Sequence, residues 1–332
     1  MNYPVQPRIT VVTALYNSSR FIERLHQSLT KQSNMEFEWI VIDDGSIDDS
    51  ADLVLSLSAP WYGGTSVYRM PENTGGPLAY ALGILKATTG IVTTVDHDDE
   101  LTPSLMETVL QYWPEVERDH RSAGLIFQVM DPISGNTIGA KLPEGLITTF
   151  NKLQAYYPAV TDVAGFFKAD IAKRYMSLSD MEMVALGGVP MRAMSGPYTV
   201  LHPVGLVSRM YHRDNNSSQT LSVRISDKFV FTYAKLINSL DIHALWQPVL
   251  WLRRMVAASR LSIIVHKSPV YHLRYISRPL PKVLAALMTP LGLLAYTLRK
   301  GSDRVVTYRK TDLAQLARLV PYGVSSHGKG GD

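Results

Sequence analysis

Hydrophobic and polar positions alternate with strand and helix periods along the first 131 residues. Short β-branched runs, typical of buried strands, are separated by segments with apolar residues at helical spacing. The strands are expected at 8–15, 38–43, 65–70, 91–96 and 123–130. The helices between them are expected at 18–32, 48–57, 77–87 and 103–117. This alternation predicts an α/β fold in which a mostly parallel sheet is covered by helices on both faces.

The pattern is less regular beyond residue 131. Helical character is found at 169–174, 180–186, 227–240 and 245–259. Residues 198–211 form a long, partly β-branched stretch, and Pro248 interrupts the last helical segment near its start. The second half of the chain is therefore expected to contain more helix and fewer strands than the first.

Composition is that of an ordered globular protein with a hydrophobic core. The 332 residues are 46% hydrophobic and 19% charged. A chain of this length is sufficient for one large domain or two smaller ones. No cysteine is present, so disulfides, thiolate chemistry and cysteine-based zinc sites are excluded. The first residues lack the basic and apolar regions of a signal peptide, and we expect a cytoplasmic protein.

Charge is distributed unevenly along the chain. Residues 1–100 hold 6 Lys or Arg and 13 Asp or Glu, whereas residues 241–332 hold 14 and 4. The acidic first third is compatible with a metal-binding half. The basic last third is compatible with phosphates, acidic glycans, nucleic acid or anionic lipid, and charge does not choose among them.

Three carboxylates follow the expected fourth strand directly. Asp96, Asp98 and Asp99 lie within four positions, where they would repel one another in a half-buried crevice. A divalent cation with oxygen ligands, such as Mg²⁺ or Mn²⁺, would relieve this repulsion and bind a diphosphate at the carboxyl edge of the sheet. The alternative is a solvated acidic turn that caps the helix beginning near Pro103.

Other polar loops are expected at the same edge of the sheet. They lie at 13–17, 43–50 and 71–77, and the paired glycines of the last loop let the backbone approach a ligand closely. Each loop also has an ordinary structural explanation as a turn or helix cap, and Tyr16 could belong to the core.

Taken together, these loops resemble the N-terminal half of a family 2 glycosyltransferase with the GT-A fold. The resemblance covers residues 8–105 and is carried by four segments: ITVVTALYN, EWIVIDDGSIDDS, NTGGPLAYALG and GIVTTVDHDDELTP. The chain departs from the common family pattern at Ala14, where proline is frequent, and has His97 at the variable middle position of the Asp-x-Asp motif.

The resemblance implies a site for a nucleotide-sugar donor, most often a uridine diphosphate sugar. Asp43 would hold the nucleobase, and Asp96 and Asp98 would bracket the diphosphate through Mn²⁺ or Mg²⁺, with Asp98 as the direct ligand. Asp99 would bind sugar hydroxyls or support the metal shell. The remaining residues of the expected donor site are Thr13, Leu15, Tyr16, Asp44, Asn73 and Gly75.

The resemblance also implies an inverting reaction in which a carboxylate acts as the general base. We expect Asp180 in this role, with Glu182 as the second candidate, although both could be charges at a helix N-terminus. The Glu-Asp pair common in the family is missing. His212 is expected near the metal or diphosphate, where Arg209 or Arg213 could neutralise phosphate charge; a capping or core role is equally open for His212.

A segment of 16 uncharged residues, 283–298, is flanked by Lys282 and by Arg299 and Lys300. As a helix it would measure about 24 Å, which is shorter than the hydrocarbon core of about 30 Å, and Pro290 would kink it. We expect residues 279–300 to lie in the plane of a membrane surface. The alternatives are a helix packed on the protein or in a dimer interface, and a spanning helix.

The sequence thus predicts a GT-A domain at 1–220 and a basic, mainly helical extension at 221–332. Within the domain, 1–131 would bind the nucleotide-sugar and metal, and 132–220 would bind a glycan or lipid-linked glycan acceptor. We expect an enzyme in the cytoplasm or at the inner face of the cell membrane. Its oligomeric state, monomer or homo-oligomer, is left open. Nucleic acid is not expected, because no recognition motif is present. The alternatives are a nucleotidyltransferase and a non-catalytic nucleotide-sugar-binding or scaffold subunit.

Overall fold

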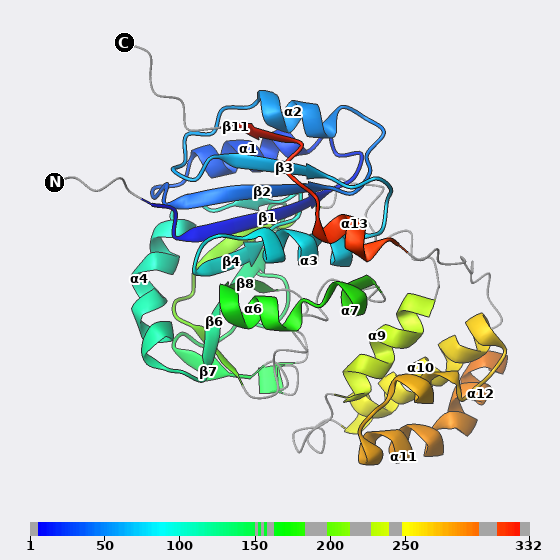
Figure 1. Cartoon of the computed structure of the whole chain (residues 1–332). Coiled ribbons are helices and arrows are strands. Elements are labelled where there is room, and N and C mark those ends of the chain that lie inside the picture. Colours follow the sequence, from blue (N-terminus) through cyan, green and yellow to red (C-terminus); the bar gives the residue numbers. More distant parts are fainter. Residues whose placement is uncertain are drawn as a thin grey trace, which may run out of the picture.

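The computed structural model describes most of the chain. It covers residues 6–149, 152–153, 156–157, 163–182, 198–212, 227–238, 248–298 and 311–325. A layered α/β part holds the sheet, and a separate group of helices lies beside it (Figure 1). The predicted fold class, α/β with C-terminal helices, is confirmed.

The secondary structure follows the predicted alternation. The strands are β1 Ile9–Leu15, β2 Phe37–Asp43, β3 Thr65–Arg69, β4 Ile91–Thr94, β5 Glu100–Leu101, β6 Ser122–Met130, β7 Leu146–Thr148, β8 Val163–Lys168, β9 Thr199–His202, β10 Val207–Met210 and β11 Gly323–Ser325. The helices of the α/β part are α1 Ile22–Thr30, α2 Ser50–Ser56, α3 Gly76–Lys86, α4 Leu105–Arg118, α6 Ala169–Tyr175, α7 Leu178–Glu182 and α13 Leu313–Ala317. The separate group contains α9 Asp227–Asn238, α10 Pro248–His266, η2 Tyr271–Tyr275, α11 Pro279–Leu287 and α12 Thr289–Leu298.

The sheet is mixed rather than uniformly parallel. Its order is β11-β3-β2-β1-β4-β8-β6-β10-β5, with β9 beside β6 and β7 beside β9. Strands β3, β2, β1 and β4 are parallel, as predicted, but β8 lies between β4 and β6 and is antiparallel to both. Gly124 permits this insertion, because a Cβ there would lie 1.9 Å from the Phe166 carbonyl oxygen.

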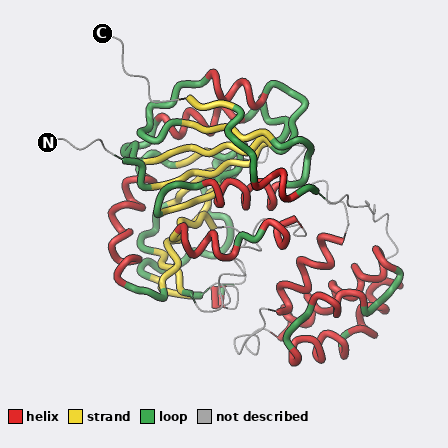
Figure 2. Tube along the Cα trace, in the orientation of Figure 1, coloured by secondary structure: helices red, strands yellow, loops and turns green. Residues whose placement is uncertain are grey.

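Helices cover both faces of the sheet (Figure 2), and a hydrophobic layer lies between the helices and the sheet on each face. One layer combines strand residues such as Val11 and Trp39 with the apolar sides of α1, α2 and α4. The other combines Val12 and Ile42 with α3, α6 and α7. Successive residues of a strand point to opposite faces, so a strand buried on both sides appears as the continuous apolar run seen in the sequence.

Two predicted segments of the helical group can be compared with the structure. The helix expected at 245–259 continues to His266, and its described part is Pro248–His266. The apolar segment 283–298 belongs to two helices, α11 and α12, which are bent by 44°. Pro290 is the second residue of α12, directly after this bend, so the kink predicted near Pro290 is confirmed.

The end of the described chain returns to the α/β part. Strand β11 pairs antiparallel with β3, and Val324 lies opposite Ser66. Lys86 of α3 donates hydrogen bonds to the Ala317 and Leu319 carbonyl oxygens, at 3.2 and 2.7 Å. Residues 313–325 therefore add a strand to the sheet, which the predicted helical extension at 221–332 did not include. The boundary near residue 220 stays a prediction.

Candidate donor-binding site

The predicted polar loops meet at one edge of the sheet. Leu15, the last residue of β1, lies opposite Asp43, the last residue of β2, and the Asp44 N–H donates to the Leu15 carbonyl at 2.9 Å. Strand β4 runs parallel to β1 on its other side, and the Val95 N–H donates to the Val12 carbonyl. The loops that follow β1, β2 and β4 therefore emerge side by side, as expected for parallel strands.

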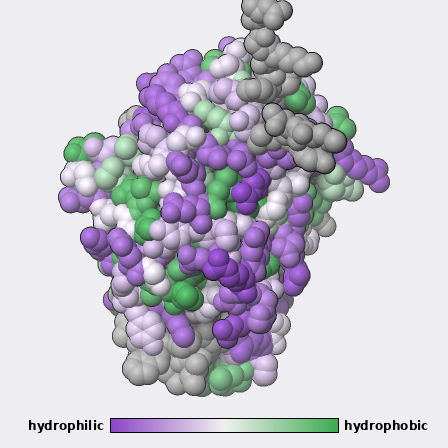
Figure 3. Space-filling model, turned by 90° about the vertical axis from the view of Figure 1, so that its left-hand side faces the viewer, coloured by the Kyte–Doolittle hydropathy of each residue, from purple (hydrophilic) through white to green (hydrophobic). Residues whose placement is uncertain are grey.

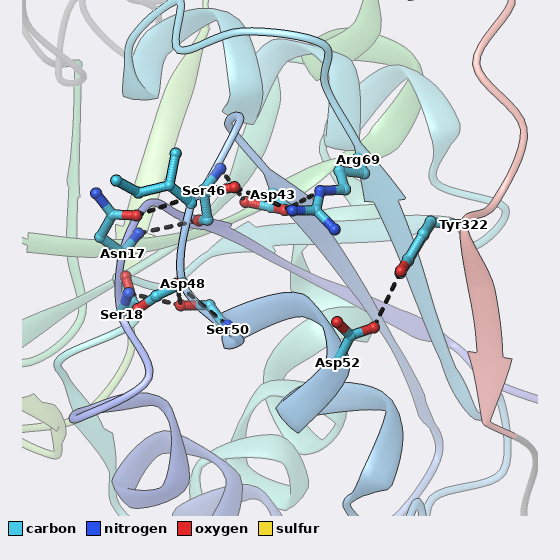
Figure 4. Close-up of polar contacts among 10 residues, drawn as sticks. Asn17, Ser18, Asp43, Ser46, Asp48, Ser50, Asp52, Arg69 and Tyr322 are labelled. Carbon is cyan, nitrogen blue, oxygen red and sulfur yellow. Dashed lines mark hydrogen bonds and ion pairs between the residues drawn. The ribbon is translucent and has the colours of Figure 1, made fainter.

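Asp43 is held by neighbours from its own loop and from β3 (Figure 4). Its side chain is completely buried, the Ser46 N–H donates to Oδ1 at 2.9 Å, and Arg69 Nε lies 3.2 Å from Oδ2. Arg69 also donates to the Ser46 carbonyl at 3.0 Å. A buried carboxylate needs such a cation, because an uncompensated charge would be costly there. Sequence reasoning missed Arg69, although its place at the end of β3 is the signal for it.

The first two loops are joined by hydrogen bonds (Figure 4). The Asn17 N–H donates to Ser46 Oγ at 2.9 Å, and the Asn17 side chain accepts from the Ile47 N–H at 3.0 Å. The Ser18 N–H donates to Ser50 Oγ at 2.7 Å. Asn17 has a φ of 50°, a conformation that asparagine tolerates better than most residues. These hydrogen bonds hold the first and second loops together, with Asn17 and Ser46 in direct contact.

A tyrosine from the C-terminal segment reaches the same region. The Arg69 guanidinium carbon lies 5.4 Å from the centre of the Tyr322 ring, and the Tyr322 hydroxyl donates to Asp52 Oδ1 at 3.0 Å (Figure 4). Tyr322 precedes β11, and its N–H donates to the Val67 carbonyl of β3. No local sequence signal could have placed Tyr322 here, because some 250 residues separate it from Arg69.

Asp44 connects the second loop to the 73–75 loop. Its carboxylate accepts from the Thr74 N–H, the Thr74 hydroxyl and the Gly75 N–H at 2.8, 2.9 and 2.7 Å. Burial raises the pKa of Asp44 to about 6, against the lowering effect of these hydrogen bonds and of Lys228. Lys228 of α9 donates to the Thr74 carbonyl at 2.7 Å and so ties the helical group to this loop.

Arg209 of β10 lies between two of the three predicted carboxylates. Its Nη1 is 2.7 Å from Asp99 Oδ2 and 3.5 Å from Asp96 Oδ2. The Tyr80 hydroxyl donates to Asp96 Oδ1. Charge repulsion in the 96–99 turn is therefore relieved by a protein cation, whereas the sequence argument assigned this task to a metal. Asp99 is completely buried against Arg209, so its predicted contact with sugar hydroxyls has no support in the structure.

The turn still offers oxygen ligands to a cation. Within the described ranges, no group of three or more His, Asp or Glu residues is arranged to hold a metal ion. The Asp96 side chain is 44% exposed, and Asp98, two residues later, is nearly buried. Two carboxylates fit the hard-oxygen preference of Mg²⁺ or Mn²⁺ when diphosphate and water supply the remaining ligands. His212 is paired with Glu100, with Nε2 3.4 Å from Glu100 Oε2.

The side chains of the remaining predicted donor residues differ in their exposure to solvent. Thr13 is buried and accepts a hydrogen bond from Trp39 Nε1 at 3.0 Å, and Leu15 belongs to the core, so neither side chain faces a ligand. Tyr16 is 43% exposed, and Asn73 is also exposed. Gly75 has a φ of 102°, which favours glycine. Tyr16, which directly follows β1, therefore offers its side chain to a ligand, whereas Thr13 and Leu15 do not.

The two base candidates belong to one short helix. Asp180 and Glu182 are part of α7, which packs against α3, the helix that begins at the 73–75 loop. The positions of their side chains lie outside the described part of the structure. Their assignment as general base stays a prediction.

Comparison with solved structures identifies the fold. Residues 1–349 of TarS from S. aureus in complex with UDP-GlcNAc superpose with a TM-score of 0.55, at 16% identity and covering 98% of each chain. The same TarS fragment in complex with UDP gives a TM-score of 0.54, at 15% identity, covering 87% of this chain and 89% of that chain. These structures have GT-A folds, so the predicted GT-A architecture is confirmed.

Curated relatives match part of the chain. An uncharacterized glycosyltransferase of Nostoc sp. is 28% identical over 148 residues, which are 42% of this chain and 44% of that protein. Glycosyltransferase GlyG of Streptococcus pneumoniae is 30% identical over 112 residues, 33% of this chain and 36% of that protein. The matches thus span less than half of these relatives. The family model "Glycosyl transferase family 2" matches residues 10–168, just under half of the chain, and this part of the chain is therefore similar to glycosyl transferase family 2.

Proposed function

We propose that this chain is a metal-dependent, inverting glycosyltransferase that moves a sugar from a nucleoside diphosphate sugar to a hydroxyl group of a glycan. The observation that carries the proposal is the meeting of the Asp43 loop, the 73–75 loop and the 96–99 turn at one sheet edge. Ligands of open α/β sheets bind at this edge. The match of residues 10–168 to the family 2 model and the relatives named as glycosyltransferases support the reaction class.

The donor is proposed to lie across the first three loops. The exposed Tyr16 ring would contact the nucleobase, and the Asp43 carboxylate, which Arg69 and the Ser46 N–H hold in place, would accept from the base N–H. The 73–75 loop would contact the sugar and phosphate part of the donor, since hydrogen bonds to Asp44 fix the backbone of this loop. The S. aureus TarS structures with UDP and UDP-GlcNAc share the fold, which supports testing uridine donors first.

Mn²⁺ or Mg²⁺ is proposed at Asp98 and Asp96, where its charge would favour departure of the diphosphate. Arg209 would hold the same turn in place through Asp96 and Asp99. A carboxylate on α7, Asp180 or Glu182, would accept the proton of the acceptor hydroxyl. The acceptor is proposed to be a glycan, either free or linked to lipid.

Isothermal calorimetry with uridine, guanosine, cytidine and thymidine diphosphate sugars, with and without Mn²⁺, tests the proposal. We expect one nucleotide class to bind, more tightly with Mn²⁺, and Asp98→Asn to remove the metal-dependent part. Glu117→Gln is the matched control, because Glu117 is exposed on α4 and its loss should leave binding unchanged. Absence of binding to every donor would contradict a glycosyltransferase.

The assay also separates the alternatives. A nucleotidyltransferase would form pyrophosphate from a nucleoside triphosphate and a sugar phosphate, whereas a glycosyltransferase releases a nucleoside diphosphate. A non-catalytic subunit would bind donor but release no diphosphate with any glycan acceptor. Chromatography of the nucleotide products distinguishes these results.

A further inference from the structure

The outward side of the α11 and α12 pair carries a continuous apolar stripe. Its members are large aliphatic side chains three or four residues apart, each between 48% and 79% exposed: Leu280, Val283, Leu287, Leu291, Leu294 and Leu298. Residues at this spacing lie on one side of a helix. We name these six residues the α11–α12 stripe.

The inner side of the same pair combines small residues with Leu284, Met288 and Tyr296, which pack against the core of the helical group. Pro281, Ala285 and Gly292 are buried, and a Cβ on Gly292 would lie 2.4 Å from the Ser259 side chain of α10. A helix at the surface of a soluble protein normally directs its large apolar residues to the core and its polar residues to water. This pair packs only some of its large apolar residues inward and leaves the six residues of the stripe exposed, which indicates that the stripe has an apolar partner.

The charge around the stripe indicates the nature of that partner. Residues 242–302 contain nine Lys or Arg and no Asp or Glu, and Arg274, Arg278 and Lys282 are exposed next to or within α11. Apolar side chains flanked by cations suit an anionic lipid surface. A second copy of this chain suits it less well, because two such surfaces would bring like charges together.

The packing of the pair restricts how it can meet lipid. Among the described helices none is by itself long and apolar enough to cross a membrane, although α11 and α12 together pass by length and composition. They are bent by 44°, and α12 packs against α10. One side alone is therefore available to lipid, as in a helix that lies in the membrane plane.

We propose that the α11–α12 stripe inserts in the plane of an anionic membrane, with Arg278 and Lys282 at the level of the lipid headgroups. A contrasting face of the molecule, seen from the left of Figure 1, is mostly hydrophilic with small, separated hydrophobic areas (Figure 3). Docking does not depend on the proposed glycosyl transfer. If both hold, the site would work beside lipid-linked acceptors at the inner face of the cell membrane.

Flotation of the full chain with vesicles tests the proposal. We expect binding to vesicles of phosphatidylcholine and phosphatidylglycerol, and much weaker binding to phosphatidylcholine alone. The triple variant Leu287→Glu, Leu291→Glu and Leu294→Glu should lose at least about tenfold in affinity for the anionic vesicles. The new carboxylates remove apolar surface that would be buried in lipid, and anionic headgroups repel them. Lys282→Gln should lose about fivefold, and the loss should shrink at high salt.

A matched control uses exposed apolar residues elsewhere. Ile133 and Ile147 are 91% and 65% exposed, so Ile133→Glu with Ile147→Glu adds two carboxylates, against three in the triple variant, without touching the stripe. This variant should bind vesicles as the unmodified chain does. Circular dichroism and thermal unfolding of each variant establish that folding is intact, which is expected because the replaced side chains are exposed.

Insertion itself can be read from a single fluorophore, because the chain has no cysteine. A dye on Leu291→Cys should shift to shorter wavelength with anionic vesicles, and the same dye on Ile133→Cys should not. Failure of the unmodified chain to bind, or equal binding by the triple variant, would overturn the proposal. So would a dimer in sedimentation analysis that the triple variant separates without any vesicle binding, since the stripe would then be a protein interface.

Discussion

Arg209 and Asp99 form a buried ion pair beneath the candidate donor site. Nη1 of Arg209 lies 2.7 Å from Oδ2 of Asp99, and the two side chains are 8% and 0% exposed. Arg209 belongs to β10, whereas Asp99 follows β4. The pair therefore fixes the acidic turn to a strand that lies three positions away in the sheet order.

Removal of the cation should destabilise the fold. We expect Arg209→Met to lower the free energy of unfolding by about 3–5 kcal/mol, because Asp99 would lose its close cation in a buried position. Adding Asp99→Leu should restore much of that loss, since neither position of the pair would then carry a buried charge. Urea denaturation measures both variants.

A surface ion pair provides the control for this experiment. Arg121 Nε lies 3.8 Å from Asp119 Oδ1, and the two side chains are 71% and 35% exposed. Arg121→Met should cost less than about 1 kcal/mol, because solvent screens exposed pairs. Similar losses for Arg209→Met and Arg121→Met would contradict the importance assigned to the buried pair.

Asp44 should make stability depend on pH in the acidic range. Burial raises its pKa from 3.8 to about 6, so the folded chain binds more protons than the unfolded chain between these values. The contribution of Asp44 to stability should fall by about 3 kcal/mol as pH rises from about 4 to above 6, at 1.36 kcal/mol per pKa unit. Asp44→Asn should remove this slope, measured by urea denaturation across that pH range.

Asp49 offers the matched substitution for the pH experiment, because it is exposed in the same acidic loop. Asp49→Asn should keep the slope of the unmodified chain. A slope that survives in Asp44→Asn would mean that another group causes it.

The Tyr322 ring should support donor binding through Arg69. Tyr322→Ala removes the ring from the guanidinium, a contact worth about 0.5–1 kcal/mol at exposed sites, and should raise the donor Kd a few-fold. Tyr322→Phe keeps the ring and loses the hydrogen bond to Asp52, so its donor affinity should stay unchanged. Calorimetry compares the donor Kd of the two variants. Equal Kd values would mean that the Tyr322 ring does not contribute to donor binding.

One carboxylate on α7 should be needed for turnover and not for donor binding. We expect either Asp180→Asn or Glu182→Gln to reduce kcat by about 10²–10⁴, the usual contribution of a general base, with an unchanged donor Kd. Asp170→Asn is the control, because Asp170 is exposed on α6 in the same half of the chain. Full activity in both α7 variants would place the base elsewhere.

The sequence predicted the parallel strands and their loops accurately. Strand β1, for example, ends at Leu15 as expected, because a β-branched run buried on both faces gives a strong local signal. It did not predict that β8 would separate β4 from β6, since that pairing depends on a close approach at Gly124. Pro290 was predicted to kink the apolar segment, and the chain bends by 44° next to it, between α11 and α12.

The sequence by itself therefore determined the alternation of strands and helices, and with it the edge of the sheet where Asp43 and Asp96 emerge. Local hydrophobic period and chain direction suffice for that. Only the tertiary structure decided which charges compensate these carboxylates: Arg69 and Arg209 reach them from other strands. The physical reason is that an ion pair depends on distances between segments far apart in the chain, and local patterns do not contain such distances.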